Sequence, residues 1–249
     1  MSTLAAFFVA VALADACRHS TTRRWPTLAA GPVAIIAWAL LCGLWHAGDI
    51  ALLAFAATST VLWSLGCYRA ERDSSRHRAP LALFGGTVAG LAALSGWSSP
   101  VAGLIDDWLS WVGLTALDPT RAVMIAGVMA VQLATGNEIV RLILGAVGIR
   151  GSMGAAQATA EPQPSDRLKG GRLLGPMERL FIVGLGLGGQ LGAASIVVAA
   201  KSIIRFPELS AQRKEGEGSS AIDEVTEYFL VGSFASWLLA MAGLALVLA

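Results

Sequence analysis

The sequence predicts an all-α protein, a polytopic transmembrane helical bundle of about seven spans. Three observations lead to this prediction. Hydrophobic residues make up 55% of the 249-residue chain and charged residues only 14%, whereas a soluble domain carries about 25% charged residues to solvate its surface. The apolar residues form runs close to the ~20 residues that cross a bilayer core. The loops between these runs alternate between basic and acidic, as short loops do in membrane proteins.

The apolar segments are separated by short polar connections. They cover residues Leu4–Cys17, Pro26–Trp45, Ile50–Tyr68, Pro80–Trp97, Ala122–Ile149, Leu180–Ala200 and Phe229–Ala249. The first segment is shorter than a span requires, so the sequence leaves open whether it crosses the bilayer fully. Residues 100–117 combine the acidic pair Asp106 and Asp107 with Trp108 and Trp111, which favours a helix lying in the membrane interface over a span.

The charges of the loops predict that the amino terminus lies outside the cell. Two basic clusters, residues 18–24 and 69–78, favour the cytoplasm, whereas residues 98–120 contain three aspartates and no Lys or Arg. The pattern becomes inconsistent near the end of the chain, because Lys201 and Arg205 follow a span that should end outside. The orientation of the final hairpin therefore stays open.

A linker divides the predicted helices into two groups. Residues 151–171 are rich in small residues and contain Pro162 and Pro164, a composition typical of flexible linkers. Residues 1–150 then form amino-terminal transmembrane helices, and residues 172–249 form a carboxy-terminal helical hairpin.

The sequence contains no recognisable reaction centre. It lacks the HExxH metal motif, the GxSxG nucleophile motif and the phosphate-binding GxxxxGK[ST] loop, and its three cysteines lie singly in apolar segments. We therefore predict no catalytic residue, no metal site and no cofactor. The net charge of +1 gives no reason to expect nucleic acid as a partner.

Three glycines in the sixth apolar segment recur every four residues, at Gly184, Gly188 and Gly192. In a continuous helix they would lie on one face, where small residues let two helix backbones approach closely in lipid. We therefore predict helix packing at this face, within the bundle or between copies. A nucleotide-binding loop is disfavoured, because the glycine run follows no strand.

Polar residues on the same segment predict a second surface. Gln190, Lys201 and Glu208, which we call the polar stripe, fall close together on a helical wheel, with Arg205 slightly offset. They are candidates to line a ligand site or to bind an anionic lipid headgroup. In the alternative, structural interpretation, Gln190 bonds a neighbouring helix and the basic side chains reach the headgroups. Glu227 and its acidic neighbours could pair with Lys201 and Arg205 across the hairpin.

Asn137 and Glu138 form a further candidate cluster with Arg141. Glu138 and Arg141 are three positions apart and can pair on one helix face, which favours an ion pair near the bilayer edge. Thr135 and Gly136 precede them and could loosen the helix, which leaves a binding site at a broken helix open.

The end of the chain contains a longer pattern, MERLFIVGLGLGGQLGAASIVVAAKSIIRFPEL followed by EYFLVGSFASWLLA. This pattern resembles the carboxy-terminal part of an uncharacterised bacterial multi-pass membrane-protein family, one of the domain-of-unknown-function families. The resemblance matches Glu178, Arg179, Gln190, Lys201, Ser202, Arg205, Phe206, Glu208, Glu227, Tyr228, Gly232 and Ser236. It implies a multi-pass membrane protein without an established activity. Asp15 echoes an aspartate in the family's first helix, without the histidine that precedes it there.

Three functions follow as hypotheses. The first is a module of the bacterial plasma membrane that packs with itself or a membrane-protein partner, or that binds anionic lipid, because of the glycine face and the basic loops. The second is a small-molecule or ion transporter, with the polar stripe, Asn137 and Glu138 lining a path. The third is an intramembrane enzyme acting on a lipid-linked substrate, with Lys201, Ser202, Glu208 or Glu227 as candidates.

Overall fold

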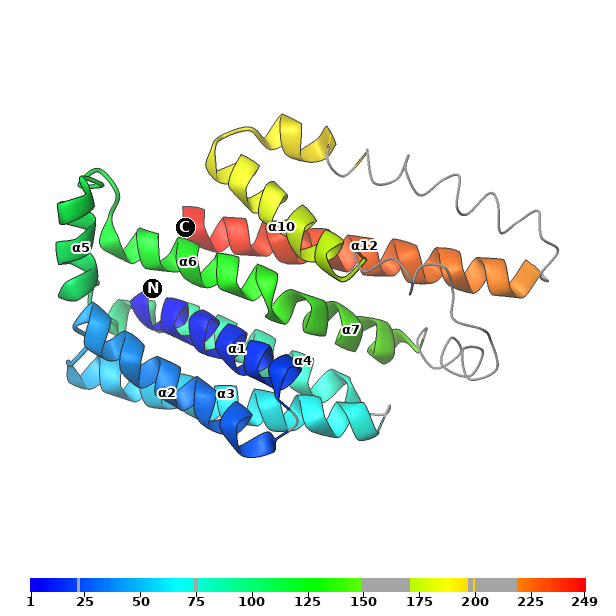
Figure 1. Cartoon of the computed structure of the whole chain (residues 1–249), viewed down its shortest axis with the longest axis horizontal. Helices are drawn as coiled ribbons and strands as arrows, with labels where there is room; N and C mark the ends of the chain where they lie inside the picture. The colour runs from blue at the N-terminus through cyan, green and yellow to red at the C-terminus, as the bar shows by residue number, and fades with distance from the viewer. Residues whose placement is uncertain (22, 74–75, 149–170, 197–198, 200–218) are drawn as a thin grey trace. The chain divides into compact units, whose positions relative to one another are not determined.

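The computed structural model describes residues 1–21, 23–73, 76–148, 171–196, 199 and 219–249 (Figure 1). Every regular element in these ranges is helical, which confirms the all-α class. The described residues belong to two compact units, Met1–Thr135 and Gly136–Ala249. The predicted linker lies outside the described ranges except for Gly171 at its end.

Unit 1, Met1–Thr135, is built around its first helix. Its elements are α1 (Ser2–Ser20), α2 (Arg24–Cys42), α3 (Ala47–Arg72), α4 (Arg78–Ala93), the 3-10 helix η2 (Ser95–Trp97), α5 (Leu104–Val112) and α6 (Pro119–Leu133). Helix α1 packs against α2, α3, α4 and α6, which surround it in Figure 1. Its length and apolar composition suffice for a membrane span, although the sequence had left this segment undecided.

Small and aromatic side chains explain why α1 forms the centre of unit 1. A Cβ atom added to Gly127 of α6 would lie 3.0 Å from the Ala5 carbonyl oxygen, so the two helices approach closely at this glycine. Aromatic rings fill the space beside α1: the ring centroids of Phe7 and Phe84 are 5.7 Å apart, and those of Trp63 and Phe84 are 5.2 Å apart. The first helix is therefore buried by its neighbours.

The loops of unit 1 lie at opposite ends of its long helices. At one end, Arg18 bonds Glu71, and the Arg24 guanidinium lies over the Tyr68 ring, so the two predicted basic clusters meet. At the other end, the backbone N–H of Ala102 donates to the carbonyl of Cys42, and η2 and α5 follow α4. This arrangement agrees with basic loops on one side of the membrane and acidic ones on the other.

Unit 2 contains α7 (Thr135–Val147), α10 (Gly171–Leu187) and α12 (Ser219–Leu248). Helix α7 therefore groups with the carboxy-terminal helices, whereas the sequence placed it among the first 150 residues. Helices α10 and α12 pack side by side, most closely at Gly186, where an added Cβ atom would lie 2.3 Å from a Leu244 methyl carbon.

The predicted span Leu180–Ala200 is not one continuous helix. Helix α10 ends at Leu187, Gly189 adopts a positive φ of 73°, and helical conformation resumes at residues 191–196. Glycine allows this left-handed turn because it has no Cβ atom. A glycine-rich run that sequence periodicity assigned to a helix face thus interrupts the helix instead.

Within the described residues, four helices are long and apolar enough to cross a membrane: α1, α2, α3 and Leu230–Leu248 of α12. Helices α6 and α7, separated by Ala134, would together make a fifth, broken span. The predicted number of about seven spans is not confirmed. Helix α4 is apolar but has only 16 residues, and the sixth predicted segment is interrupted. These apolar helices suggest a membrane protein.

Candidate functional site

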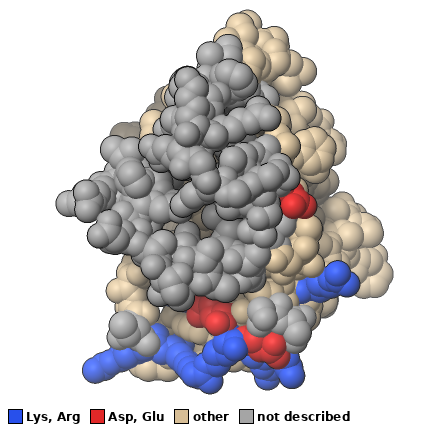
Figure 2. All heavy atoms as spheres, turned by 90° about the vertical axis from the view of Figure 1, so that its right-hand side faces the viewer, with Lys and Arg blue, Asp and Glu red and all other residues tan. Residues whose placement is uncertain are grey.

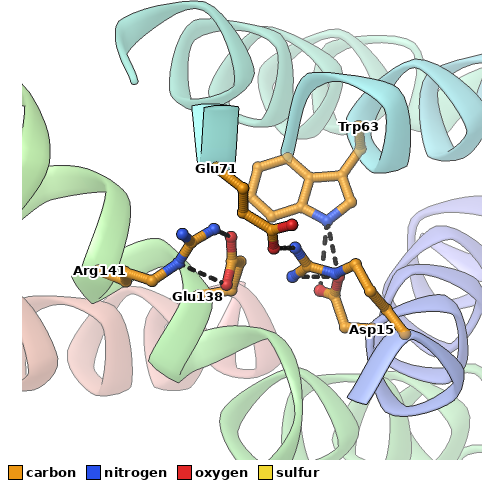
Figure 3. A network of polar contacts seen from close by, with 6 residues as sticks. Asp15, Trp63, Glu71, Glu138 and Arg141 are labelled. Atoms are coloured by element: carbon orange, nitrogen blue, oxygen red, sulfur yellow. Dashed lines mark hydrogen bonds and ion pairs between the residues drawn. The ribbon is translucent and has the colours of Figure 1, made fainter. Parts of the chain in front are cut away.

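A cluster of charged residues and an indole is buried in unit 1. The Asp15 carboxylate accepts hydrogen bonds from the Trp63 indole N–H, with 3.2 Å to each carboxylate oxygen, and from Arg18 at 3.2 Å. Arg18 also donates to Glu71 at 2.9 Å. Figure 3 shows the Asp15 carboxylate beside the indole nitrogen of Trp63, which belongs to a different helix. The cluster thus links α1 to α3.

The geometry of this cluster is that of a structural tie. Asp15 is 1% exposed and Trp63 is fully buried. A buried carboxylate needs a cation and donors to offset the loss of hydration, and Asp15 has both. Every partner named here belongs to the protein, so the cluster holds helices together without presenting an activated nucleophile.

The sequence patterns did not predict this cluster. Only Asp15 was mentioned among them, through the family resemblance. The local signal was an aspartate three positions before Arg18 in an otherwise apolar helix, a spacing at which opposite charges can pair. Nothing local pointed to Trp63, because it is 48 positions away from Asp15 in the chain.

A second polar centre joins the three helices of unit 2 at Arg179, and we call it the Arg179 centre. From α10, the Arg179 guanidinium donates to Asn137 Oδ1 of α7 at 2.8 Å and to Ser236 Oγ of α12 at 3.2 Å. It lies against Gly136, where an added Cβ atom would be 2.7 Å from its Nε atom. Arg179 is 1% exposed. The fork of guanidinium donors suits contacts with several helices at once.

Neighbouring residues extend the contact between α10 and α12. The Trp237 indole N–H donates to Glu178 at 2.7 Å, beside the bond from Arg179 to Ser236. Two consecutive residues of α10 therefore bond two consecutive residues of α12. Glu178, Arg179 and Ser236 also belong to the residues matched by the family resemblance, and the structure brings them together.

The predicted pair of Glu138 and Arg141 is confirmed. Arg141 Nε donates to Glu138 at 2.9 Å, a second contact joins the same two side chains, and Figure 3 shows both on one helix. Glu138 is buried at 3% exposure. Asn137, which we grouped with Glu138 as a lining residue, is exposed and is bonded by Arg179 instead.

Several predicted site residues lie elsewhere. Gln190 is exposed at the end of the turn that follows α10, outside a continuous helix, and its role toward a ligand or a neighbouring helix stays a prediction. Glu227 is also exposed, on α12. The remaining candidates, Lys201, Ser202, Arg205 and Glu208, lie outside the described residues.

The predicted glycine face is interrupted, and its packing between copies stays a prediction. Gly184, Gly188 and Gly192 do not share a continuous helix, because α10 ends before Gly188. An added Cβ atom at Gly184 or Gly192 would meet nothing within 4 Å among the described residues. Close packing within unit 2 occurs at Gly186, whose backbone lies against the Leu244 side chain.

Two of the pockets on the described surface concern the helices discussed above. One, about 370 Å³ in volume, lies between α7 and α12 of unit 2. Its lining is wholly apolar: Ile139, Ile143, Val231, Phe234, Ala235, Leu238 and Leu239. The other, about 250 Å³, lies at the basic end of unit 1 between α2 and α3. No group of metal-ligating side chains occurs among the described residues.

The comparisons with known proteins add no relative to these observations. No protein-family model, no curated protein and no solved structure matches the chain.

Proposed function

We propose that this chain is an integral protein of the bacterial plasma membrane that works as a helical packing module. It associates laterally with a second copy of itself or with another membrane protein. The basic loops at one end of unit 1 and the family resemblance of the carboxy-terminal residues support a bacterial plasma membrane. The apolar helices support insertion in a bilayer.

An exposed face of α4 carries the proposal. Ala82, Gly86, Ala89 and Ala93 are exposed and lie three or four positions apart, so they form one strip of small residues. A Cβ atom added to Gly86 would meet nothing within 4 Å among the described residues. Small residues on an open helix face in lipid are typical of surfaces that pack against a second helix.

The exposed surface of α2 provides a contrast. There, the large side chains of Val33, Ile36 and Leu40 point outwards, each between 55% and 61% exposed. Such branched side chains suit contact with lipid tails, whereas the smooth strip on α4 allows the close backbone approach that drives helix association. The difference between these two faces favours α4 as the packing surface.

The buried polar clusters support a module over an enzyme. Arg18 and Trp63 both donate to Asp15, and the guanidinium of the Arg179 centre bonds neighbouring helices. A catalytic group must be able to contact a substrate atom, whereas these side chains form hydrogen bonds with other residues of the protein.

The test uses Ala89→Ile with Ala54→Ile as a matched control. Both alanines are exposed on apolar helices, but Ala54 lies on α3 next to Phe55, which is a large exposed side chain. We expect Ala89→Ile to weaken self-association or partner retention by about tenfold, since the added side chain separates the helices. Native mass spectrometry of the protein in lipid nanodiscs measures self-association and partner retention. Equal association of the two variants, or a bare monomer for the parent chain, would contradict the proposal.

One observation favours transport as a second candidate function. The helical conformation is interrupted at Ala134, between α6 and α7. Asn137 lies three positions later and accepts a hydrogen bond from Arg179. Broken helices with polar side chains at the break form the substrate sites of many carriers. In proteoliposomes, Asn137→Leu should abolish solute flux while Asp107→Asn, at an exposed position on α5, leaves it unchanged. Flux that survives Asn137→Leu would remove this assignment.

A further inference from the structure

The pocket at the basic end of unit 1 combines positive charge with an apolar wall. It has a volume of about 250 Å³ and lies where α2 begins and α3 ends. Its lining consists of Arg24, Leu28, Leu65, Tyr68, Arg69 and Arg72. Three of these six residues are arginines and none is acidic. The pocket is therefore suited to an anion that also carries hydrocarbon.

The arginines of the pocket have charge available for a ligand. Arg24, Arg69 and Arg72 are exposed, and none of them forms an ion pair with a carboxylate of the described residues. Arg18 and Arg76 nearby differ, because Asp15 and Asp73 pair with them. Figure 2 shows basic side chains gathered along the lower edge of the view, with acidic side chains among them.

Two features orient the positive charge. The Arg24 guanidinium lies 5.5 Å from the centroid of the Tyr68 ring, a distance at which a cation is attracted to the aromatic face. Helix α2 begins at Arg24 without a side-chain cap and without an acidic residue in its first turn. Its unpaired backbone N–H groups and the positive end of the helix dipole therefore add to the attraction for an anion.

The apolar wall runs from the pocket toward the membrane. Leu28 is one turn into α2, and Leu65 is one turn before the arginine pair on α3. Both helices are long and apolar enough to span a bilayer, so their charged ends correspond to the headgroup level. Trp25, 72% exposed, lies at the same end of α2, as aromatic residues do at membrane interfaces.

We propose that this pocket binds an anionic glycerophospholipid. Guanidinium groups of Arg24, Arg69 and Arg72 hold the phosphate through paired N–H donors, and the first carbons of an acyl chain lie along Leu28 and Leu65. The proposal depends on α2 and α3 crossing the membrane. It does not depend on packing at α4, so either can fail without the other.

The test measures lipid retained by the full chain taken from nanodiscs that contain equal amounts of phosphatidylglycerol and phosphatidylcholine. Native mass spectrometry should find phosphatidylglycerol bound in preference. Arg69→Gln should reduce its retention by about tenfold, because the variant loses a charge-assisted hydrogen bond to the phosphate, which contributes about 1.5 kcal/mol. Arg69→Lys should recover only part of this, since lysine keeps the charge but loses the planar fork.

Arg78→Gln is the matched control. Arg78 is also exposed and close in the chain to the basic end, at the start of α4, but it does not line the pocket. Arg78→Gln removes the same charge but no hydrogen bond to the bound phosphate, so retention should stay within about twofold of the parent. An equal loss in both variants would reveal a diffuse basic surface and overturn the proposal, as would equal retention of the two lipids by the parent chain.

A competition experiment separates a lipid site from a site for soluble phosphate. Inorganic phosphate at the concentration of the lipid should leave phosphatidylglycerol bound, because it cannot contact Leu28 and Leu65. Displacement by inorganic phosphate would overturn the assignment to lipid. A parent chain that retains phosphatidylglycerol but stays monomeric would support the lipid site and refute the packing function.

Discussion

Asp15 illustrates how a single residue can be stabilised deep inside an apolar helix. Two donors, the Trp63 indole and the Arg18 guanidinium, share its carboxylate, and Arg18 is in turn bonded by Glu71. Removing one member of a buried charge pair leaves its partner without compensation. The negative charge of Asp15 therefore contributes to the stability of unit 1.

We expect Asp15→Asn to lower the free energy of unfolding by about 2–3 kcal/mol, because Arg18 keeps Glu71 but loses its buried partner. Denaturant titration in detergent micelles measures the change. The control is Asp73→Asn, which removes an exposed pair with Arg76, worth less than about 1 kcal/mol. Equal losses would show that burial of the Asp15 pair adds nothing.

The residue scale also shows which polar contacts a sequence can predict. Glu138 and Arg141 are three positions apart, and their pairing follows from helix geometry alone. The Arg179 centre could not be predicted in this way, because 42 and 57 positions separate Arg179 from Asn137 and Ser236. Only the packing of three helices brings these side chains within bonding distance.

At the scale of the element, the glycines of α10 show that spacing does not fix their role. Gly184, Gly188 and Gly192 have the spacing of a packing face, yet the structure uses Gly186 for the close approach to Leu244. The helix turns after Leu187, and Gly189 has a positive φ. Consecutive glycines can end a helix or can form a flat packing face on it, and the spacing of glycines in the sequence does not distinguish these outcomes.

Gly186→Leu should therefore destabilise unit 2 by about 1–3 kcal/mol, because the new side chain overlaps Leu244 in a packed contact. Gly184→Leu, two positions earlier on the same helix, adds a side chain where no described residue lies within 4 Å of the new Cβ atom, and should change stability by less than about 0.5 kcal/mol. Thermal unfolding in detergent compares the two. A larger loss of stability for Gly184→Leu than for Gly186→Leu would contradict the packing of α12 against Gly186.

Helix α1 gives a second lesson at this scale. Its predicted apolar run, Leu4–Cys17, looked short because Arg18 follows it, and the sequence left open whether it crosses the bilayer fully. Asp15 and Arg18 are buried by neighbouring helices, so α1 extends from Ser2 to Ser20 as the centre of unit 1. Charged residues shorten an apolar run in the sequence without shortening the helix when partners compensate them.

At the scale of the whole molecule, the two ends of unit 1 differ in charge. The clusters around Arg24 and Arg69 meet at one end, and α5 with Asp106 and Asp107 follows the loop at the other. The rule that basic loops remain in the cytoplasm predicts the sidedness of this arrangement.

Cysteine labelling tests that sidedness. In a chain whose three native cysteines are replaced by alanine, Asp107→Cys should react with a membrane-impermeant maleimide in intact cells. Arg76→Cys should react only in inverted vesicles, because both positions are exposed but lie at opposite ends of unit 1. Labelling of both positions from the same side would show that α2 and α3 do not cross the membrane as proposed.

The sequence alone determined the helical class, most of the apolar segments, the shared side of the basic clusters and the pairing of Glu138 with Arg141. These depend on composition and on residues within a turn or two, which sequence patterns report directly. The tertiary structure decided that α1 is central, that the helix ends after Leu187, and that the Arg179 centre joins three helices. It also placed Arg24 beside Arg69 in one pocket, because such contacts depend on how distant helices pack.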